Sequence, residues 1–600
     1  MTTLKVITRN NSNWFVFISL ALAIVVKCVL FQQLVFETLN LDSFASMFKF
    51  YGTVLFIAIF LSSFVFISKH YWWTVALLLL IDIWELGNFT YYRANGVFLN
   101  MDAILMADNM SGFWDSVIVY FSWKSYMPFL ISMIYAIIIY TVPKSPKRHW
   151  KWFITCIVLC YLFFPIRQFK TWRNNIDNLK IESTNTGIKY ILEIYAPLFT
   201  PYNSVLGKAY VSYISGSKAQ WEEKYIRESS VVDYFFAMIW FEAAYVYHQK
   251  KNNSREEQEL SYAEQTMLSS CIQRNGTNIP NTNLIIIIVE SLESWGIDYQ
   301  WDGIYAMPCL RNFLQNKHIF YADKIKSQAK HGVSGDGQMI INTGLLPISS
   351  GAACRIYGTN TYPNIAHYYK KSVTLNPSAG AWNQSVVNPN YGISELYESN
   401  DMRNDISVFQ ELNARIEDNP ESEFIMAITV STHTPFSLAK EIDYKTDQDM
   451  PEILSNYIKC LNYTDEQIGK FIDKFLLSPQ WNQSTTLVIT GDHTIFKQML
   501  LDEFKEYASI KNLPIKNGKN YCPLIVFSPN IHEPIKYTKE CYQMDIFPTI
   551  TNIIGCDDYY WKGLGINLMD SAKVRTISEQ QAYKLSDKLI RTNYFNSLYE

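Results

Sequence analysis

Long apolar runs are concentrated in the first 170 positions of the chain. A helix needs about 20 mostly apolar residues to cross a lipid bilayer. Five runs approach this length: Trp14–Phe36, Phe48–Ile67, Trp73–Phe89, Tyr126–Val142 and Trp150–Ile166. Trp and Tyr stand at several of their ends, as is typical of helices that end in the lipid interface. The pattern predicts a transmembrane domain of five helices over residues 1–167.

The charged residues between these runs predict an orientation. With the N-terminus inside, seven Lys and Arg residues lie in inner segments and three in outer loops. Short cytoplasmic loops carry the excess of positive charge, so we expect the N-terminus inside and the residues after the fifth span outside. Val231–His248 is also long enough to span, but it contains Asp233 and Glu242. We interpret it as an amphipathic surface helix, with a sixth span as the alternative.

The pattern of apolar and polar residues changes after the fifth run. Residues 168–270 are polar and aromatic by turns, which predicts a helical linker. From residue 271, short β-branched runs alternate with helical stretches such as Ile453–Phe471. The predicted strands are Asn283–Glu290, Phe424–Val430, Thr486–Thr490 and Leu524–Phe527. Such alternation is typical of a mostly parallel sheet covered by helices, here over residues 271–600.

Composition excludes two broad classes of protein. The chain is 49% hydrophobic and 18% charged, which excludes a disordered protein. The 52 Lys and Arg against 55 Asp and Glu leave no basic excess for a nucleic-acid partner. Seven of the ten cysteines follow the apolar runs, and this odd number predicts at least one free thiol there.

Side chains suited to metal chemistry follow the predicted strands. Glu290 ends the first, His433 follows the second, and Asp492 and His493 follow the third. A glycine-rich loop between the first two contains Ser334. Chemistry in open α/β sheets collects at the carboxyl ends of strands. Two carboxylates, an imidazole and a hydroxyl there predict a site for a divalent cation.

Five segments, in this order, resemble motifs of the membrane-bound branch of the sulfatase/alkaline-phosphatase superfamily. That branch contains lipoteichoic acid synthases, which are phosphoglycerol transferases, and phosphoethanolamine transferases. The segments are NLIIIIVES, SGDGQMIINTGLLP, VSTHTPF, ITGDHT and QMDIFPTITNIIG, the last with Asp545 and Pro548. The resemblance covers the whole chain. It implies a multi-pass α-helical membrane domain plus an α/β sulfatase-like (alkaline-phosphatase-type) extracytoplasmic domain.

The resemblance also implies roles for individual residues. Glu290, Asp492 and His493 match metal ligands, for one Mn²⁺ or Zn²⁺ ion. Ser334 stands where the family has a threonine that is both nucleophile and metal ligand. His433 matches a histidine on the substrate side, where it would bind substrate or shuttle a proton.

The chain also departs from the family pattern. Trp382, Asn383 and Gln384 match a substrate-binding Trp-Asn-Arg, but a glutamine replaces the arginine. The upstream His and acidic residue of the glycerol phosphate pocket are absent as well. No signature for making formylglycine surrounds Ser334, so sulfate ester hydrolysis is not expected. His331, three residues before Ser334, is a further candidate for the site.

Taken with the resemblance, the residues predict a metal-dependent phosphotransferase in the bacterial cytoplasmic (inner) membrane. It would move a phosphoglycerol- or phosphoethanolamine-type head group from a phospholipid to a glycan or lipid acceptor outside the cytoplasm. The reaction would pass through a phosphoester of Ser334. Two alternatives remain: a phosphodiesterase or phosphatase-like hydrolase of the same superfamily, and a non-catalytic, sulfatase-shaped binding protein.

Overall fold

The computed structural model describes most of the chain in two compact units, residues 1–104 with 120–253 and residues 105–119 with 254–600. The described residues are 12–36, 44–95, 98–101, 104, 121, 123–143, 148–160, 222–239 without 224 and 228, and 260–596. Within the last range, the gaps are 273–279, 331, 349–350, 378–380, 400–402, 496–505, 518–519, 557–558 and 571. We call the first unit the membrane unit and the second the head.

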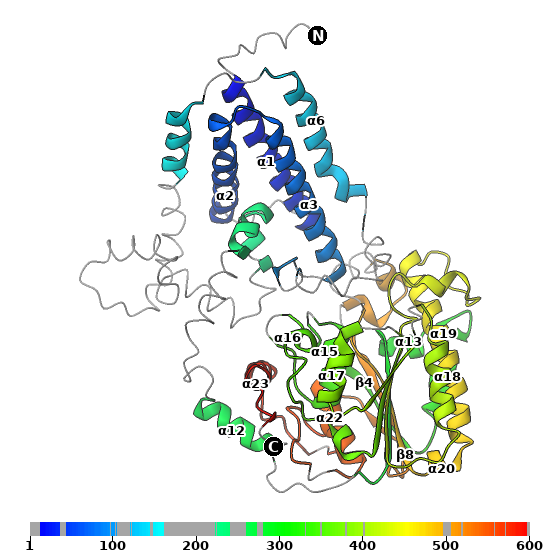
Figure 1. Ribbon diagram of the computed structural model, residues 1–600. Coiled ribbons are helices and arrows are strands. Elements are labelled where there is room, and N and C mark those ends of the chain that lie inside the picture. Colours follow the sequence, from blue (N-terminus) through cyan, green and yellow to red (C-terminus); the bar gives the residue numbers. More distant parts are fainter. Residues whose placement is uncertain are drawn as a thin grey trace. The chain divides into compact units, whose positions relative to one another are not determined.

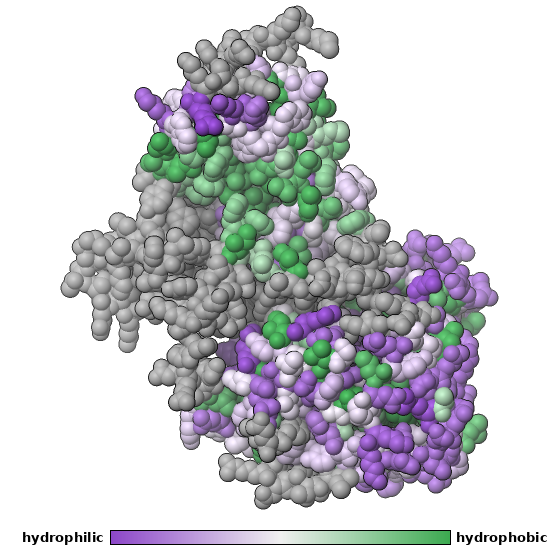
Figure 2. All heavy atoms as spheres, viewed as in Figure 1, coloured by the Kyte–Doolittle hydropathy of each residue, from purple (hydrophilic) through white to green (hydrophobic). Residues whose placement is uncertain are grey.

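The membrane unit is built from apolar helices (Figure 1). They are α1 (Ser12–Phe36), α2 (Phe44–Ser63) with η2 (Phe64–Ile67), α3 (Trp72–Asn95), and η4 (Trp123–Tyr126) leading into α6 (Met127–Thr141). Four of these helices are long and apolar enough to cross a membrane. Their apolar side chains gather on the surface of this unit (Figure 2). Four predicted spans are therefore confirmed as apolar helices.

The fifth predicted span is described only in its first part. Trp150–Cys160 forms a shorter apolar helix, and residues 161–166 lie outside the described residues, so this span stays a prediction. The predicted linker also lies mostly outside them. Of Val231–His248, residues 231–239 are helical, and the Trp84 indole of α3 donates a hydrogen bond to the Val231 carbonyl at 2.8 Å.

An ion pair joins three helices inside the membrane unit. Lys27 of α1 pairs with Asp82 of α3, and both side chains are fully buried. The Lys27 ammonium also donates to the Pro128 carbonyl of α6 at 2.8 Å, and the Ser132 hydroxyl donates to Asp82 at 2.5 Å. Charged groups inside a membrane domain are costly unless they are paired in this way. The contacts therefore fix α1, α3 and α6 to one another.

The head contains a nine-stranded mixed sheet in the order β10-β4-β9-β8-β1-β7-β5-β6, with β11 beside β4. The strands are β1 (Asn283–Val289), β4 (Ile319–Lys326), β5 (Lys371–Asn376), β6 (Glu395–Glu398), β7 (Glu423–Ile428), β8 (Thr485–Gly491), β9 (Cys522–Phe527), β10 (Ile535–Tyr537) and β11 (Cys541–Tyr542). The strands from β8 to β6 are parallel. β9, which the sequence grouped with the parallel strands, runs antiparallel to both of its neighbours.

Helices cover both faces of this sheet (Figure 1). On one face lie α15 (Ser334–Thr343), α17 (Gln384–Asn390), α22 (Ile546–Ile553) and α23 (Glu579–Arg591); on the other lie α18 (Ile406–Arg415), α19 (Glu452–Leu476) and α20 (Pro479–Asn482). All seven residues of β1 are buried, as expected for a strand between two helical layers. The predicted helix Ile453–Phe471 is the central part of α19. All ten cysteines are free thiols.

The strand register brings three chain segments to one edge of the sheet. Val289, the last residue of β1, lies opposite Gly491 of β8, and Ile288 lies opposite Ile428 of β7. Because the three strands are parallel, their carboxyl ends coincide. The residues that follow them, including Glu290 and Asp492, therefore meet at this edge.

Candidate metal centre

Three predicted metal ligands meet where β1 and β8 end. Glu290 directly follows β1, and Asp492 and His493 directly follow β8. One ligand atom from each lies within 4.8 Å of the others, and all three side chains are buried. They form the one group of this kind among the described residues.

Ser334 is the first residue of α15 and faces these ligands. Its hydroxyl donates to Glu290 Oε2 at 3.0 Å and lies 3.3 Å from His493 Nε2. The dipole of a helix favours negative charge at its N-terminus. The hydroxyl therefore lies where an alkoxide or a phosphoryl oxygen is stabilised.

The backbone around the site is held in unusual conformations. Val333 and Ser291 have φ angles of 44° and 52°. A β-branched residue rarely adopts positive φ, and such strain clusters at functional sites. A Cβ on Gly337 would lie 2.2 Å from the Asp492 carbonyl oxygen, so only glycine lets α15 approach the end of β8 this closely. These constraints bring Ser334 up to the ligands.

Hydrogen bonds orient each ligand. The Ser291 hydroxyl donates to Glu290 Oε1 at 2.7 Å, and the backbone N–H groups of Ser291 and His493 both donate to Asp492 Oδ1 at 2.8 Å. His493 Nδ1–H donates to the Thr494 carbonyl at 3.1 Å, which directs Nε2 towards the carboxylates. Partners of this kind fix the tautomer and orientation of metal-binding histidines.

The electrostatics of the two carboxylates differ. Burial alone would raise the pKa of Glu290, but His493, His433 and the Ser291 hydroxyl together hold it below the ordinary value. Burial and the adjacent Glu290 carboxylate raise the pKa of Asp492 to about 7. Two carboxylates this close repel each other when both are charged, and either a proton or a bound cation relieves this repulsion.

The donor set fits a small divalent cation. His493 Nε2 lies 3.3, 3.4 and 3.5 Å from oxygen atoms of Ser334, Glu290 and Asp492 respectively. Ligand atoms about 2.1 Å from a tetrahedral zinc ion lie about 3.4 Å from one another. Carboxylate and imidazole ligands also suit manganese. The residues present therefore could hold either metal.

Two further predicted residues lie close to this group. His433 contributes to the low pKa of Glu290, and the hydroxyl of its neighbour Thr432 donates to the Glu290 carbonyl at 2.5 Å. Trp382 packs beside the start of α15, because a Cβ on Gly335 would meet its ring at 3.0 Å. His433 therefore lies near Glu290, and Trp382 lies beside the residue that follows Ser334.

The other two residues of the Trp-Asn-Gln segment have structural contacts. The Asn383 amide donates to the Cys354 carbonyl at 2.9 Å. Gln384 is buried; it donates to Gln338 at 2.8 Å and accepts from Asn376 at 2.5 Å. These contacts hold the Gln384 side chain between Gln338 of α15 and Asn376 of β5.

Two sequence candidates remain, His331 and Asp545. His331 is outside the described residues. Asp545 pairs with Arg575 at 2.6 Å and accepts from the Tyr542 and Ile566 N–H groups, which fixes the C-terminal segment of the head.

Two supporting residues had no predicted role. The Gln543 amide donates to the Asp492 carbonyl at 2.5 Å, and Ser291 contacts both acidic ligands. Ser291 directly follows Glu290, and Gln543 lies within the QMDIFPT segment. Their closeness to these motifs was the one feature of the sequence that could have indicated a role.

Comparison with known proteins identifies both parts of the chain. Residues 282–556 match the sulfatase family model, and residues 1–179 match the model of the lipoteichoic acid synthase N-terminal domain. With its four apolar helices, the chain is a multi-pass membrane protein.

Two bacterial relatives align with this chain. It is 24% identical to lipoteichoic acid synthase 2 of Bacillus subtilis (strain 168) over 312 residues, 47% of this chain and 47% of that protein. This chain thus matches about half the length of that relative. It is 21% identical to the lipoteichoic acid synthase of Staphylococcus saprophyticus over 543 residues, 86% of this chain and 77% of that protein.

A solved structure of a lipooligosaccharide phosphoethanolamine transferase from Neisseria meningitidis aligns with 90% of this chain and 96% of its own, at 12% identity and a TM-score of 0.48. The two family models and the two sequence relatives lead to one assignment. The chain is a sulfatase-family protein with a lipoteichoic acid synthase N-terminal domain, homologous to lipoteichoic acid synthases.

Proposed function

We propose that this protein is a phosphoglycerol transferase of the lipoteichoic acid synthase type, with Ser334 as its nucleophile. One observation carries the proposal: the Ser334 hydroxyl, at the N-terminus of α15, contacts both Glu290 and His493 of the buried ligand group. The homology to lipoteichoic acid synthases supports the reaction type. The intact ligand group argues against a non-catalytic binding protein.

The proposed reaction consists of two displacements at phosphorus. In the first, Ser334 Oγ bonds to the phosphorus of a phospholipid head group, and the bond from phosphorus to the diacylglycerol oxygen breaks. The Ser334 proton leaves to a base, and the departing diacylglycerol oxygen takes up a proton. In the second, an acceptor hydroxyl oxygen bonds to the phosphorus and the bond from phosphorus to Ser334 Oγ breaks. The acceptor proton leaves to a base, and Ser334 Oγ takes up a proton.

His433 is suited to the proton transfers. Its Nδ1–H donates to the Thr434 carbonyl at 2.6 Å, which directs Nε2 to exchange a proton with the departing or attacking oxygen. An imidazole nitrogen can both accept and donate a proton, as the two displacements require.

The metal would be one Mn²⁺ or Zn²⁺ ion held by Glu290, Asp492 and His493, with Ser334 completing the set. When bound, it would lower the pKa of the Ser334 hydroxyl and stabilise negative charge on the phosphoryl oxygens.

The membrane unit fits a lipid donor. Anchoring the head beside the bilayer raises the local concentration of a substrate that does not leave the membrane. We place the protein in the bacterial cytoplasmic membrane with the head outside the cytoplasm, where envelope glycans and lipids serve as acceptors.

Mass spectrometry of the Ser334 peptide tests the proposal. We expect a glycerophosphate adduct after incubation of the full chain with phosphatidylglycerol and metal, and its transfer when an acceptor is added. A phosphoethanolamine adduct from phosphatidylethanolamine would instead make that lipid the donor. Release of free head-group phosphate without any acceptor requirement would identify a hydrolase. The absence of any Ser334 adduct with all donors would contradict the proposed nucleophile.

A further inference from the structure

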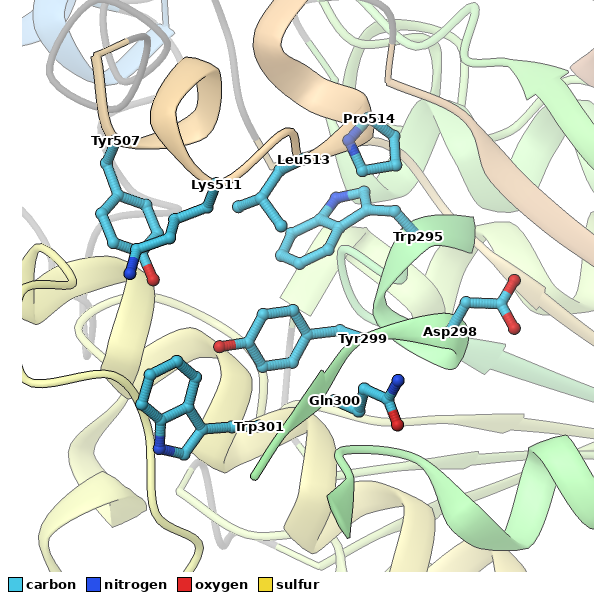
Figure 3. Close-up of a pocket in the computed structure, with 9 residues that line it drawn as sticks. All are labelled: Trp295, Asp298, Tyr299, Gln300, Trp301, Tyr507, Lys511, Leu513 and Pro514. Atoms are coloured by element: carbon cyan, nitrogen blue, oxygen red, sulfur yellow. The ribbon is translucent and has the colours of Figure 1, made fainter. Parts of the chain in front are cut away.

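The head contains an aromatic cavity that the proposed chemistry does not use. Its volume is about 300 Å³, and Trp295, Tyr299, Trp301, Tyr507 and Lys511 line it (Figure 3). The two indoles and two phenols come from two chain segments more than 200 residues apart. Figure 3 shows the Tyr299, Trp295 and Trp301 rings around a shared opening.

The aromatic wall is rigidly built. Trp295 and Asp298 belong to α13 (Ser294–Asp298), and Trp301 to the hairpin of β2 (Gln300–Trp301) and β3 (Ile304–Tyr305). The two-residue turn of this hairpin, Asp302 and Gly303, has φ angles of 51° and 76°, as tight hairpins of this kind require. The Tyr444 hydroxyl donates to the Ile304 carbonyl at 2.9 Å and fixes the second strand. A preformed wall of this kind lowers the entropy cost of binding a ligand.

The charged groups at the cavity are paired. Asp298 forms an ion pair with Arg311, and the Lys511 ammonium lies 2.6 Å from Asp447 Oδ2. The Tyr507 hydroxyl also donates to Asp447 at 3.0 Å. The described lining residues therefore offer no uncompensated charge for a phosphate or for a cation.

A cationic ligand is further disfavoured by Lys511. Its ammonium lies 5.7 Å from the centre of the Trp301 ring and 5.9 Å from that of Tyr507. A cation is attracted to the faces of aromatic rings within about 6 Å. Lys511 already takes this position at two of the rings, and a second cation would meet its charge.

An uncharged sugar fits what remains. The C–H face of a pyranose ring stacks on aromatic rings, while its hydroxyl groups need polar partners at the rim, such as the exposed Gln300 side chain. The volume lies at the lower end of the roughly 300–1,000 Å³ range of ligand pockets, enough for one or two sugar rings. We propose that this cavity is a carbohydrate subsite that binds a neutral sugar of the acceptor. This proposal rests on the proposed transferase function.

A shared carboxylate links the cavity to the metal centre. The Trp295 indole donates to Glu293 Oε2 at 2.5 Å, and the backbone N–H of Ile495 donates to Glu293 Oε1 at 3.0 Å. Glu293 is three residues after Glu290, and Ile495 two residues after His493. The segment after Glu290 thus continues directly into the cavity wall at Trp295, and the segment after His493 contacts the same Glu293 carboxylate, as expected if one acceptor contacts both sites.

Calorimetric titration of the full chain with cellobiose and with maltose tests this subsite. The protein is held in lipid nanodiscs, because glycoside detergents carry competing sugars. The titration uses the Ser334→Ala variant, so that binding is measured without transfer. We expect saturable binding of at least one disaccharide, weakened about tenfold by Trp301→Ala and retained in Trp301→Phe, which keeps a ring. Tyr262→Ala removes an exposed ring of α12 (Tyr262–Cys271) outside the cavity and should bind as the parent does.

The outcomes separate the two proposals. Absence of disaccharide binding, equal binding by Trp301→Ala, or tighter binding of choline or sn-glycerol 1-phosphate than of the sugars would overturn the subsite. None of these results affects the Ser334 adduct, which is measured on the Ser334-containing protein. Conversely, sugar binding that depends on the Trp301 ring, in a protein that forms no adduct on Ser334, would support a sugar site and contradict the proposed transferase reaction.

Discussion

At the residue scale, Ser334 carries the sharpest prediction. Replacing it with alanine removes the only nucleophile we assign, so we expect donor cleavage to fall by roughly 10⁴-fold or more and the covalent adduct to vanish. Ser334→Thr keeps the hydroxyl and should retain measurable activity, reduced by the added methyl group at a buried position. Diacylglycerol release and mass spectrometry of the intact protein provide the two readouts.

Ser291→Ala is the matched control, because this second hydroxyl also donates to Glu290 but belongs to no proposed covalent step. It should still form an adduct on Ser334. An adduct found on Ser291, or one that persists in Ser334→Ala, would reassign the nucleophile.

The metal ligands give a second prediction at this scale. Glu290→Gln and Asp492→Asn keep the side-chain shape but remove a charged ligand, so bound metal should fall well below one ion per chain and turnover should be lost. Asp465→Asn is the control: this buried carboxylate accepts from the Cys309 and Leu310 N–H groups, away from the ligand group. Elemental analysis of the purified chains measures the metal, and full occupancy in Glu290→Gln would remove Glu290 from the site.

How far the sequence revealed this site depended on what each residue contacts. Glu290, Asp492 and His493 could be placed together because parallel strands share a carboxyl edge, and the structure has them there. Gln384 contacts Gln338, 46 residues away, and Asn376, eight residues away across a loop, so no periodic pattern indicated these contacts. Gln543 was missed for the same reason, since its partner is a backbone carbonyl 51 residues away.

At the element scale, the close approach of α15 to β8 can be tested directly. Gly337→Ala would place a Cβ 2.2 Å from the Asp492 carbonyl oxygen, so the N-terminus of α15 has to move away from the ligands. We expect the free energy of unfolding to fall by about 1–3 kcal/mol. We expect turnover to fall further than the loss of folded protein explains. Ile340→Val, in the buried part of the same helix, should cost about 0.5–1.5 kcal/mol and leave turnover near normal. Equal turnover of the two variants, measured well below their unfolding temperatures, would contradict this role of Gly337.

The sequence predicted elements where apolar runs were long and missed them where polar residues are buried. β1, β7, β8 and β9 were all predicted. β5 was not, because four of its six residues are polar: Ser372 donates to the Gly392 carbonyl at 3.0 Å and Asn376 donates to Gln384 at 2.5 Å. Only tertiary partners make such residues compatible with the interior. The antiparallel direction of β9 was equally hidden, since direction depends on the connection and not on the residues of the strand.

The ion pair between α1 and α3 makes a prediction about the membrane unit. Lys27→Met leaves Asp82 buried with only the Ser132 hydroxyl as a described partner, and should destabilise the unit by roughly 3–5 kcal/mol, as broken buried pairs do. Combining it with Asp82→Asn removes the uncompensated charge and should restore part of this loss. Unfolding temperatures of the purified variants in detergent measure both steps. A double variant less stable than Lys27→Met would show that the charge of Asp82 does not oppose burial here.

At the scale of the whole molecule, the side of the membrane on which the head lies depends on the number of spans. Four helices are long and apolar enough to cross, and an even number would return the chain to the side of its N-terminus. The fifth run, Trp150–Ile166, changes this parity. Four of the seven inner charges, Lys144, Lys147, Arg148 and Lys151, lie just before it, as expected for a cytoplasmic loop that precedes an outward crossing.

Two reporter fusions decide between these topologies. A reporter joined after Pro143, beyond the fourth span, should be active only in the cytoplasm, and one joined after Glu600 only outside it. Replacing the four charges by Asn or Gln should then weaken the outward preference of the second fusion, because they hold this loop inside; the same change at Arg93 and Lys124, in an outer segment, should not. If the fusions after Pro143 and after Glu600 report the same side, an even number of crossings separates them. Either Trp150–Ile166 does not cross, or both it and another segment, such as Val231–His248, do. A head found inside the cytoplasm would also separate it from envelope acceptors and remove the proposed transferase reaction.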